Sequence, residues 1–173
     1  MKLLRQALVA LLTNLLVLFL VLELNSSISP LGIYLTIGGI LVVYPAFSLS
    51  PVAGMPVVLI TGFMWGATLP LPLGVLPFAL GVIYAGLFRM RNRFRSRRTF
   101  HLATVATGSN LLLLIFLGIW FFPSSGWSPY LIRFLLETLL SEAAVFLLSF
   151  WIFDLQERCV DLLGAQPTPD EMT

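Results

Sequence analysis

Hydrophobic residues fill the chain in six long runs, and short stretches rich in serine, proline or charged residues separate them. Residues 111–119, for example, are apolar at every position, so no single helix face is polar there. A helix needs about 20 such residues to cross a hydrocarbon core of roughly 30 Å. The pattern therefore predicts six transmembrane helices, over residues 3–22, 31–47, 52–69, 73–88, 100–122 and 130–153.

Polar residues and prolines mark the boundaries between these predicted spans. Residues 25–30 and 48–51 each form a polar stretch that ends in proline, and residues 123–129 form a third, all of them typical of turns. The boundary between the third and fourth spans is weaker, because only Pro70 and Pro72 define it and no charge lies between them. These two segments are either two full spans or a re-entrant hairpin.

Composition places the chain in a membrane. Of its 173 residues, 58% are hydrophobic and 10% are charged, and the mean hydropathy is +0.97, whereas soluble domains carry about 25% charged residues. We therefore expect an all-α integral membrane protein, a bundle of about six transmembrane helices. Residues 1–153 form the transmembrane domain, and residues 154–173 form a short cytoplasmic helix end and a disordered tail.

Basic residues gather at places that six spans would put on one side of the membrane. Lys2 and Arg5 precede the first span, six arginines separate the fourth from the fifth, and Arg158 follows the sixth. Because lysine and arginine concentrate in short cytoplasmic loops, both chain ends are predicted to be cytoplasmic. A basic start before an apolar run also resembles a signal peptide. The run exceeds a signal core of about 7–15 residues and no clear cleavage site follows, which favours an uncleaved first span.

The loop between the fourth and fifth spans is the densest charge feature. Its arginines could hold anionic lipid headgroups, each contributing about 1 kcal/mol near an anionic surface, or bind an acidic partner. Membrane orientation alone also explains them, and that interpretation is favoured. The loop is too short for a nucleic-acid-binding module, so no nucleic acid is expected as a partner. The arginines are Arg89, Arg91, Arg93, Arg95, Arg97 and Arg98.

Motifs for catalysis and cofactor binding are absent from the sequence. It contains no GxGxxG, no GxxxxGK followed by Ser or Thr, no HExxH and no paired cysteines. His101 is the only histidine, which excludes a multi-histidine metal site. We therefore expect no cofactor, no metal and no enzymatic activity.

Glycine and proline crowd the middle of the chain. Gly62 and Gly66 form a GxxxG pattern, and Gly74 follows. Small residues let helix backbones approach closely in lipid, so helix packing is the favoured role of these three glycines. The alternative is that interrupted helices line a substrate cavity, as in transporters, although no inverted repeat is visible.

The sixth span contains ionisable residues at depths where such residues are rare. Arg133 and Glu137 are four residues apart near its outer end and should form an interfacial ion pair. Glu142 lies roughly 18 Å into the span, at a depth similar to Asn110 and Asn14. An unpaired carboxylate there would be costly, so we expect a protonated Glu142 to hydrogen-bond with Asn110 or Asn14 and connect the first, fifth and sixth helices. A proton or substrate site is the alternative.

The middle of the chain resembles a known family. Residues 62–66 (Gly-Phe-Met-Trp-Gly), residues 72–74 (Pro-Leu-Gly) and a span that ends in Arg89 and the basic run resemble MreD, the membrane protein of the bacterial rod-shape system. Chain length, span count and the short cytoplasmic tail agree with that layout. The chain departs from the family at residues 68–70, where an aspartate is usual, and in lacking a proline within residues 130–153.

The resemblance implies a noncatalytic scaffold in the bacterial inner membrane. Its implied partners are the bitopic protein MreC and the glycosyltransferase and transpeptidase of cell-wall elongation. The implied fold is similar to the six-helix substrate-binding components of energy-coupling-factor vitamin transporters, so such a component is the alternative function. That alternative requires an outer pocket with aromatic and polar groups, although Trp and Tyr are also expected at any membrane interface. The candidates are Trp120, Trp127, Tyr130 and Glu137.

Overall fold

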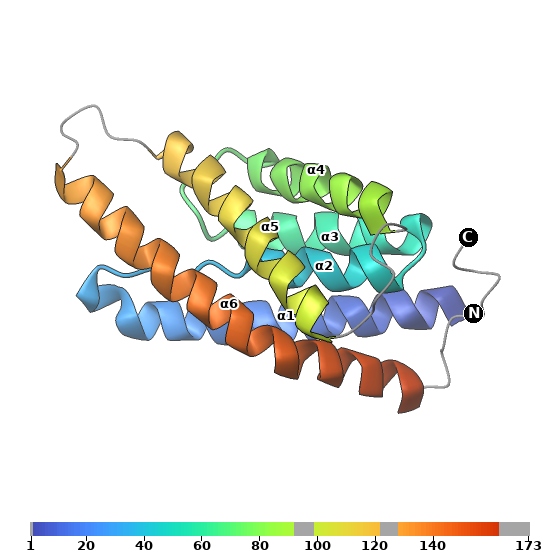
Figure 1. The fold of residues 1–173 in the computed structure, drawn as a ribbon. Coiled ribbons are helices and arrows are strands. Elements are labelled where there is room, and N and C mark those ends of the chain that lie inside the picture. Colours follow the sequence, from blue (N-terminus) through green and yellow to red (C-terminus); the bar gives the residue numbers. More distant parts are fainter. Residues whose placement is uncertain (1, 92–98, 122–127, 163–173) are drawn as a thin grey trace.

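The computed structural model describes residues 2–91, 99–121 and 128–162, and this part of the chain forms six α-helices, one short 3₁₀ turn and no strand (Figure 1). The all-helical class and the six helices confirm the corresponding predictions. In chain order the elements are α1 Lys2–Ile28, η1 Ser29–Leu31, α2 Gly38–Ser48, α3 Pro51–Gly66, α4 Val75–Met90, α5 Thr99–Trp120 and α6 Ser128–Leu162.

Two apolar stretches in the described part are long enough to cross a bilayer, as judged by length and composition. They are Leu3–Leu31, which includes η1, and Phe100–Trp120. The helices α2, α3 and α4 are also apolar but contain only 11, 16 and 16 residues. A single helix needs about 20 residues to cross the hydrocarbon core of a bilayer. Length and composition therefore support two of the predicted spans directly.

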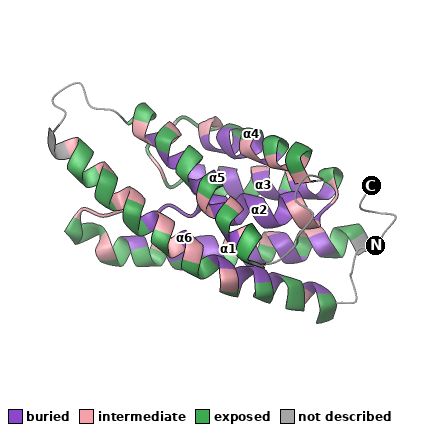
Figure 2. Ribbon diagram, viewed as in Figure 1, coloured by how far each residue is buried: buried purple, intermediate pink, exposed green. Residues whose placement is uncertain are grey.

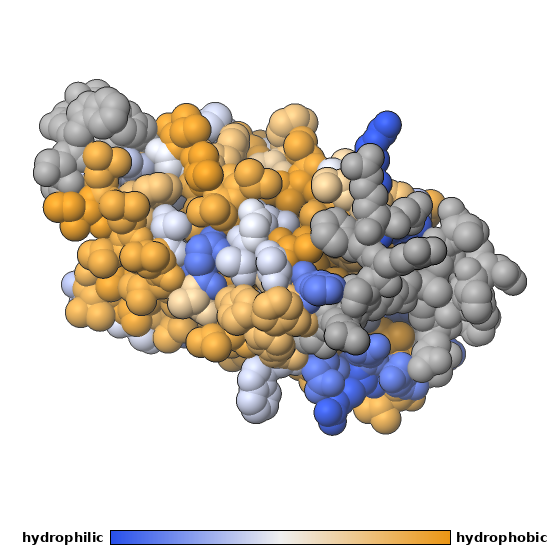
Figure 3. All heavy atoms as spheres, in the orientation of Figure 1, coloured by the Kyte–Doolittle hydropathy of each residue, from blue (hydrophilic) through white to orange (hydrophobic). Residues whose placement is uncertain are grey.

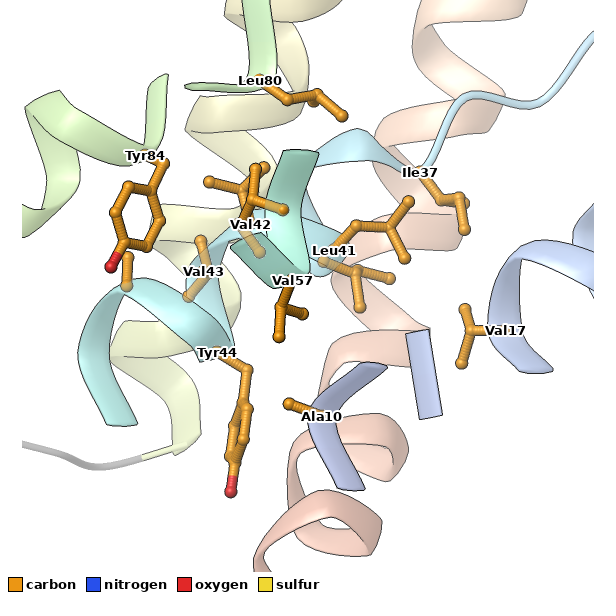
Figure 4. Packing of buried hydrophobic residues seen from close by; sticks show 14 of the residues in the cluster. Ala10, Val17, Ile37, Leu41, Val42, Val43, Tyr44, Val57, Leu80 and Tyr84 are labelled. Carbon is orange, nitrogen blue, oxygen red and sulfur yellow. The ribbon is translucent and has the colours of Figure 1, made fainter. Parts of the chain in front are cut away.

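The short helix α2 lies at the centre of the molecule, surrounded by the other helices (Figures 1 and 2). Nine consecutive residues, Gly38 to Ala46, are buried, so this part of α2 has no exposed face. A helix that is hydrophobic all round is expected to be buried in this way. In the core, side chains of α1, α3 and α4 lie around Leu41, Val42 and Val43 of α2 (Figure 4). They are Ala10 and Val17 of α1, Val57 of α3, and Leu80 and Tyr84 of α4.

The second predicted span, residues 31–47, is helical only from Gly38 onward. Gly32 has a φ of 69°, in the left-handed region that favours glycine, and residues 33–37 have no regular secondary structure. With 11 residues, α2 is about 16 Å long, roughly half the hydrocarbon thickness of a bilayer. The prediction of one continuous helix was wrong here, because side chains of α1 and α6 bind the backbone of Leu35 and Thr36 in place of helical partners.

The first helix extends beyond its predicted end at residue 22 and continues to Ile28. Asn25 and Ser27 were expected in a polar turn but lie inside α1. The hydroxyl Oγ of Ser27 donates to the carbonyl of Glu23 at 3.0 Å. Serine can satisfy its hydroxyl on the preceding helical turn, so its presence does not end a helix.

The helices α3 and α4 pack side by side as a hairpin (Figure 1). They begin and end close to the predicted boundaries of the third and fourth spans. Pro70 and Pro72 lie in the connection between them, and Gly74 immediately precedes α4. The local signals of apolar run and proline were therefore sufficient to locate both helices.

The helix α6 continues past the predicted boundary at residue 153 to Leu162. Of the predicted helix end and tail, residues 154–173, the part up to Leu162 belongs to α6, and residues 163–173 lie outside the described residues. The start of α1, the α2–α3 turn, the end of α4 and the end of α6 all lie at one end of the molecule (Figure 1). On the face shown in Figure 3, hydrophobic side chains cover much of the described surface, and hydrophilic side chains gather towards that end.

Candidate functional site

Asn110 of α5 connects the start of α2 to α6. Its Oδ1 accepts a hydrogen bond from the backbone N–H of Gly39 at 3.3 Å, and its Nδ2 donates to Glu142 Oε1 at 3.1 Å. The first bond satisfies an N–H that a helix start leaves without an intrahelical partner. The second joins Glu142 to Asn110, which was one of its two alternative expected partners, Asn110 or Asn14. The other carboxyl oxygen of Glu142, Oε2, is buried without a hydrogen-bond partner among the described residues.

Two glycines allow α2 to begin directly against α5. A Cβ atom on Gly39 would overlap the backbone carbonyl of Ala106, and one on Gly38 would overlap the side chain of Leu113. Because neither glycine has a side chain, the N–H of Gly39 comes within reach of Asn110.

Asn14 of α1 supplies a hydrogen bond that Pro45 removes from α2. Pro45 lies inside α2 and has no N–H, so the carbonyl of Leu41, four residues earlier, loses its helical donor. Asn14 Nδ2 donates to that carbonyl at 2.9 Å, and Asn14 Oδ1 accepts from Gln156 Nε2 at 3.2 Å. Asn14 thus connects α1 with α2 and α6, through partners other than Glu142.

Gln156 was missed because it lies beyond the predicted end of the sixth span. It is fully buried, and its buried neighbours on the same helix face recur every three or four residues: Ser141, Val145, Ser149 and Ile152. This helical spacing is the signal that could have identified it. Polar and apolar residues are mixed along the face, so hydropathy alone does not reveal it.

Two further polar side chains hold the irregular residues 33–37. Asn25 of α1 bonds twice to the backbone of Leu35: its Nδ2 donates to the carbonyl at 2.9 Å, and its Oδ1 accepts from the N–H at 2.8 Å. Ser141 Oγ of α6 accepts from the N–H of Thr36 at 3.0 Å. Buried backbone groups need partners of this kind when no helix supplies them, which explains why residues 33–37 need not be helical.

A cavity of about 360 Å³ lies between residues 33–37, the α3–α4 connection and the neighbouring ends of α5 and α6. This volume and the largely apolar lining are typical of small-molecule sites. Tyr34 is one of its lining residues, but the Tyr34 hydroxyl is enclosed by protein and has no hydrogen-bond partner within the described part of the chain. The lining residues are Tyr34, Thr36, Leu69, Pro70, Leu114, Leu117, Gly118, Phe121, Tyr130, Arg133, Phe134 and Glu137.

The cavity lining includes the ion pair expected from the sequence. Arg133 Nε lies 2.9 Å from Glu137 Oε1, and the arginine side chain is 62% exposed, against 19% for the glutamate. An exposed pair adds only about 0–1 kcal/mol, so its placement in the cavity matters more than its stability. Next to it, Tyr130 Oη donates to the carbonyl of Gly118 at 2.6 Å and joins α6 to α5.

The four candidates for an outer pocket do not all meet. Tyr130 and Glu137 line the cavity, whereas Trp120 is not part of the lining. Its ring instead lies beside Phe116, with ring centres 6.1 Å apart. Trp127 lies outside the described residues.

Of the three glycines predicted to pack, Gly62 makes the closest contact between α3 and α4. A Cβ atom on Gly62 would lie 2.7 Å from the Cα of Pro77, whereas one on Gly66 would lie 3.5 Å from the nearest side chain of α4. Gly62 therefore permits an approach that a larger residue would prevent, and Gly66 leaves room for a methyl group. Gly74 does not pack: no described atom lies within 4 Å of its Cβ position, and its φ is 105°. The packing role predicted for Gly74 was wrong, since its backbone conformation is what favours glycine.

Two of the six arginines in the basic loop lie in the described part of the chain. Arg89 is exposed at the end of α4. Arg91 Nη1 donates to the carbonyl of Leu49 at 3.4 Å, and its guanidinium lies 4.0 Å from the ring centre of Phe88. Arg91 thus also fastens α4 to the α2–α3 turn, beyond any role in orientation. Arg93, Arg95, Arg97 and Arg98 lie outside the described residues.

Comparison with known proteins finds no relative: no family model, no curated protein and no solved structure matches this chain.

Proposed function

We propose that the chain is a multi-pass protein of the bacterial inner membrane, with all six helices crossing the bilayer and both ends cytoplasmic. Large apolar side chains on its outer surface support this, among them Leu12 on α1, Phe78 on α4 and Leu139 on α6, which are 65%, 71% and 68% exposed. Lipid is the environment that accepts such side chains without cost. The clustering of Arg89 and Arg91 with the start of α1 also agrees with a cytoplasmic end.

The short central helix is compatible with a membrane. Irregular backbone is tolerated at membrane depth where protein surrounds it. Within residues 33–37, Asn25 satisfies both backbone groups of Leu35, and Ser141 satisfies the N–H of Thr36, which supports this condition. We propose that these residues and α2 cross the bilayer together, with the irregular part in the outer half.

Within the membrane, we propose a noncatalytic scaffold of the rod-shape machinery, similar to MreD. The observation that supports it best is that the stretch resembling MreD forms one packed unit. Gly62 lets α3 approach Pro77 of α4, and Arg91 at the end of α4 bonds to Leu49. A scaffold needs helices fixed in this way.

A scaffold also needs free helix faces for its partners, which here would be MreC and the glycosyltransferase and transpeptidase of cell-wall elongation. The helix α6 offers such a face, with Leu135, Leu139, Leu147 and Trp151 being 58%, 68%, 65% and 81% exposed. Aromatic residues of this kind often dominate the energetics of interfaces. The basic loop adds a surface for anionic lipid headgroups.

The test is affinity purification of the full chain in mild detergent, with mass spectrometry of proteins and small molecules. MreC and the two synthases should copurify with the wild type. Trp151→Ala should reduce their recovery, whereas Phe78→Ala, at a similarly exposed site on α4, should not. Recovery without any cell-wall protein would contradict the scaffold.

The cavity favours a second candidate, the substrate-binding component of a vitamin or small-molecule transporter. Its aromatic lining and the Arg133–Glu137 ion pair beside it are suited to a small molecule with one polar edge. The same purification should then yield a stoichiometric ligand. Glu137→Gln should weaken its retention without changing the fold, and a ligand-free protein with bound synthases would leave only the scaffold.

A further inference from the structure

Two charged residues line the cavity between α5, α6 and residues 33–37, and both are accessible to a ligand. Arg133 is 62% exposed and Glu137 is 19% exposed. Arg133 uses its Nε for the hydrogen bond to Glu137 Oε1 at 2.9 Å. A guanidinium has several further N–H donors, and these, like Glu137 Oε2, make no hydrogen bond with a described residue. The cavity therefore offers a ligand charged donors and a charged acceptor side by side.

Hydrophobic side chains form most of the remaining lining, among them Leu114 and Leu117 on α5 and Phe134 on α6. Gly118 makes room for Phe134 beside α5, since a Cβ atom on Gly118 would lie 2.6 Å from the ring. The Phe134 ring also stacks on the ring of Tyr130, with centres 6.1 Å apart and planes 12° apart. Because aromatic rings favour other rings as neighbours at such distances, an aromatic group suits this part of the cavity.

The size and the position of the cavity limit its ligand further. Its volume of about 360 Å³ is near the lower end of the range of roughly 300–1,000 Å³ for small-molecule sites, which suits a molecule with a single ring. The cavity lies near the α3–α4 connection and the start of α6, at the end of the molecule that we assign to the outside (Figure 1). Charged groups of a ligand are best placed at this membrane surface, because charge is costly deeper in the hydrocarbon.

The charges of Arg133 and Glu137 cancel, so the pair favours neither a purely anionic nor a purely cationic ligand. A carboxylate can accept charge-assisted hydrogen bonds from the guanidinium, and a neighbouring ammonium group can donate to Glu137 Oε2. We propose that the cavity binds an α-amino acid with a single aromatic ring as the zwitterion, with its carboxylate at Arg133, its ammonium group at Glu137 and its ring against Phe134. This inference rests on the second candidate function above and names the class of its ligand.

The experiment is isothermal titration calorimetry of the full chain in mild detergent, with L-phenylalanine as the probe. Three analogues each lack one of the groups that the cavity recognises: phenethylamine lacks the carboxylate, phenylpropanoate lacks the ammonium group, and L-alanine lacks the ring. The wild type should bind L-phenylalanine. Each analogue should bind about tenfold more weakly or worse, because a charge-assisted hydrogen bond or the burial of a ring is lost.

Two substitutions should each remove the discrimination against one analogue. Arg133→Gln should weaken L-phenylalanine about tenfold without weakening phenethylamine, which has no carboxylate. Glu137→Gln should weaken L-phenylalanine to a similar extent without weakening phenylpropanoate. Asp154 and Arg158 form the matched control pair, because they have the same spacing on α6, lie 2.8 Å apart and do not line the cavity. Asp154→Asn and Arg158→Gln should bind L-phenylalanine as the wild type does.

A wild type that does not bind L-phenylalanine, or that binds it and the three analogues equally, would overturn the inference. This comparison decides even if a variant does not fold, since it uses the wild type alone. If another small molecule copurifies and Glu137→Gln reduces its retention, the ligand class is wrong and the second candidate function stands. If no probe binds and no small molecule is retained, the second candidate function fails as well.

Discussion

Asn14, Asn25, Asn110 and Ser141 each bond to the backbone of residues 35–41. These side chains come from α1, α5 and α6, so three separate helices support the short central one. A buried backbone group without a partner costs about 1–3 kcal/mol. At the scale of single residues, these buried polar side chains therefore serve first to satisfy backbone groups of α2 and of the residues just before it.

Replacing Asn14 with leucine should lower the free energy of unfolding by about 1–3 kcal/mol, because the Leu41 carbonyl loses its donor. Pro45→Ala restores an N–H four residues after Leu41. The Asn14→Leu change should therefore cost less in a Pro45→Ala background. Unfolding of the four variants in detergent completes the double-mutant cycle, and equal costs in both backgrounds would contradict the assignment.

Glu142→Gln should fold like the wild type, because a glutamine carbonyl accepts the same bond from Asn110. Glu142→Leu and Asn110→Leu should be coupled by about 1 kcal/mol. Glu142→Leu and Asn14→Leu should be nearly additive in unfolding experiments, since Asn14 bonds to other groups. A Glu142→Gln variant that folds normally but loses partner binding or transport would point to a proton or substrate site.

At the scale of elements, close contacts at glycines set the distances between helices. Gly39 brings α2 against α5, and Gly62 brings α3 against α4. In lipid, where apolar side chains gain little by leaving the solvent, such close packing is a main source of helix association.

Gly62→Ala should destabilise the protein by about 1–3 kcal/mol, because the new methyl group meets the backbone of Pro77. Gly86 on α4 is the matched control, since no described atom lies within 4 Å of its Cβ position. Gly86→Ala should be neutral or stabilise the helix by up to about 1 kcal/mol. Thermal unfolding and the yield of monodisperse protein measure both effects. Equal effects of the two substitutions would mean that close approach at Gly62 does not contribute to the stability of the protein.

Hydropathy predicted α3 and α4 well, because apolar runs and prolines mark their ends locally. It failed at the start of α2, where the partner of Thr36 is Ser141, 105 residues further along the chain. The prediction of a turn at Asn25 was wrong for a similar reason. Asparagine is typical of turns, and only the fold shows that Asn25 lies inside α1 and bonds to the backbone of Leu35.

Contacts among the buried polar side chains could be predicted only where two residues lie at the same depth in their predicted spans. Asn110 and Glu142 share a depth, and the structure joins them. The role of Asn14 depends on its proximity to a helix containing Pro45, which no local pattern reveals. Gln156 could have been found from helical spacing, but only if the sixth helix is extended beyond its apolar run.

At the scale of the whole molecule, the position of α2 divides the bundle into two unlike halves. The half that contains the start of α1 and the end of α6 is filled by α2, and the other half contains residues 33–37 (Figure 1). The cavity lined by Tyr34 lies in that second half, whereas an apolar groove between α1 and α3, lined by Leu8, Ser50 and Val57 among others, lies in the first. In the proposed orientation, the cavity faces the outside and the groove faces lipid of the inner leaflet.

The proposed topology predicts the side on which each connection lies. Reporters fused after Arg98 and after Thr173 should both read as cytoplasmic, and one inserted at Ser125 should read as external, because each crossing reverses direction and basic residues stay inside. A cytoplasmic reading at Ser125 would contradict the six-span arrangement.

Those reporters cannot separate two full crossings of α3 and α4 from a re-entrant hairpin, because both arrangements return the chain to the cytoplasm before Arg98. Leu73 in the α3–α4 connection can, since its side chain is 80% exposed. In a Cys159→Ser background, which removes the one cysteine of the chain, Leu73→Cys should react with a membrane-impermeant maleimide in spheroplasts, where only the outer face is accessible. Val52→Cys, 82% exposed at the opposite end of α3, is the matched control and should react only after permeabilisation. If Leu73→Cys behaves like Val52→Cys, the hairpin enters and leaves on the cytoplasmic side, and the number of full crossings falls from six to four.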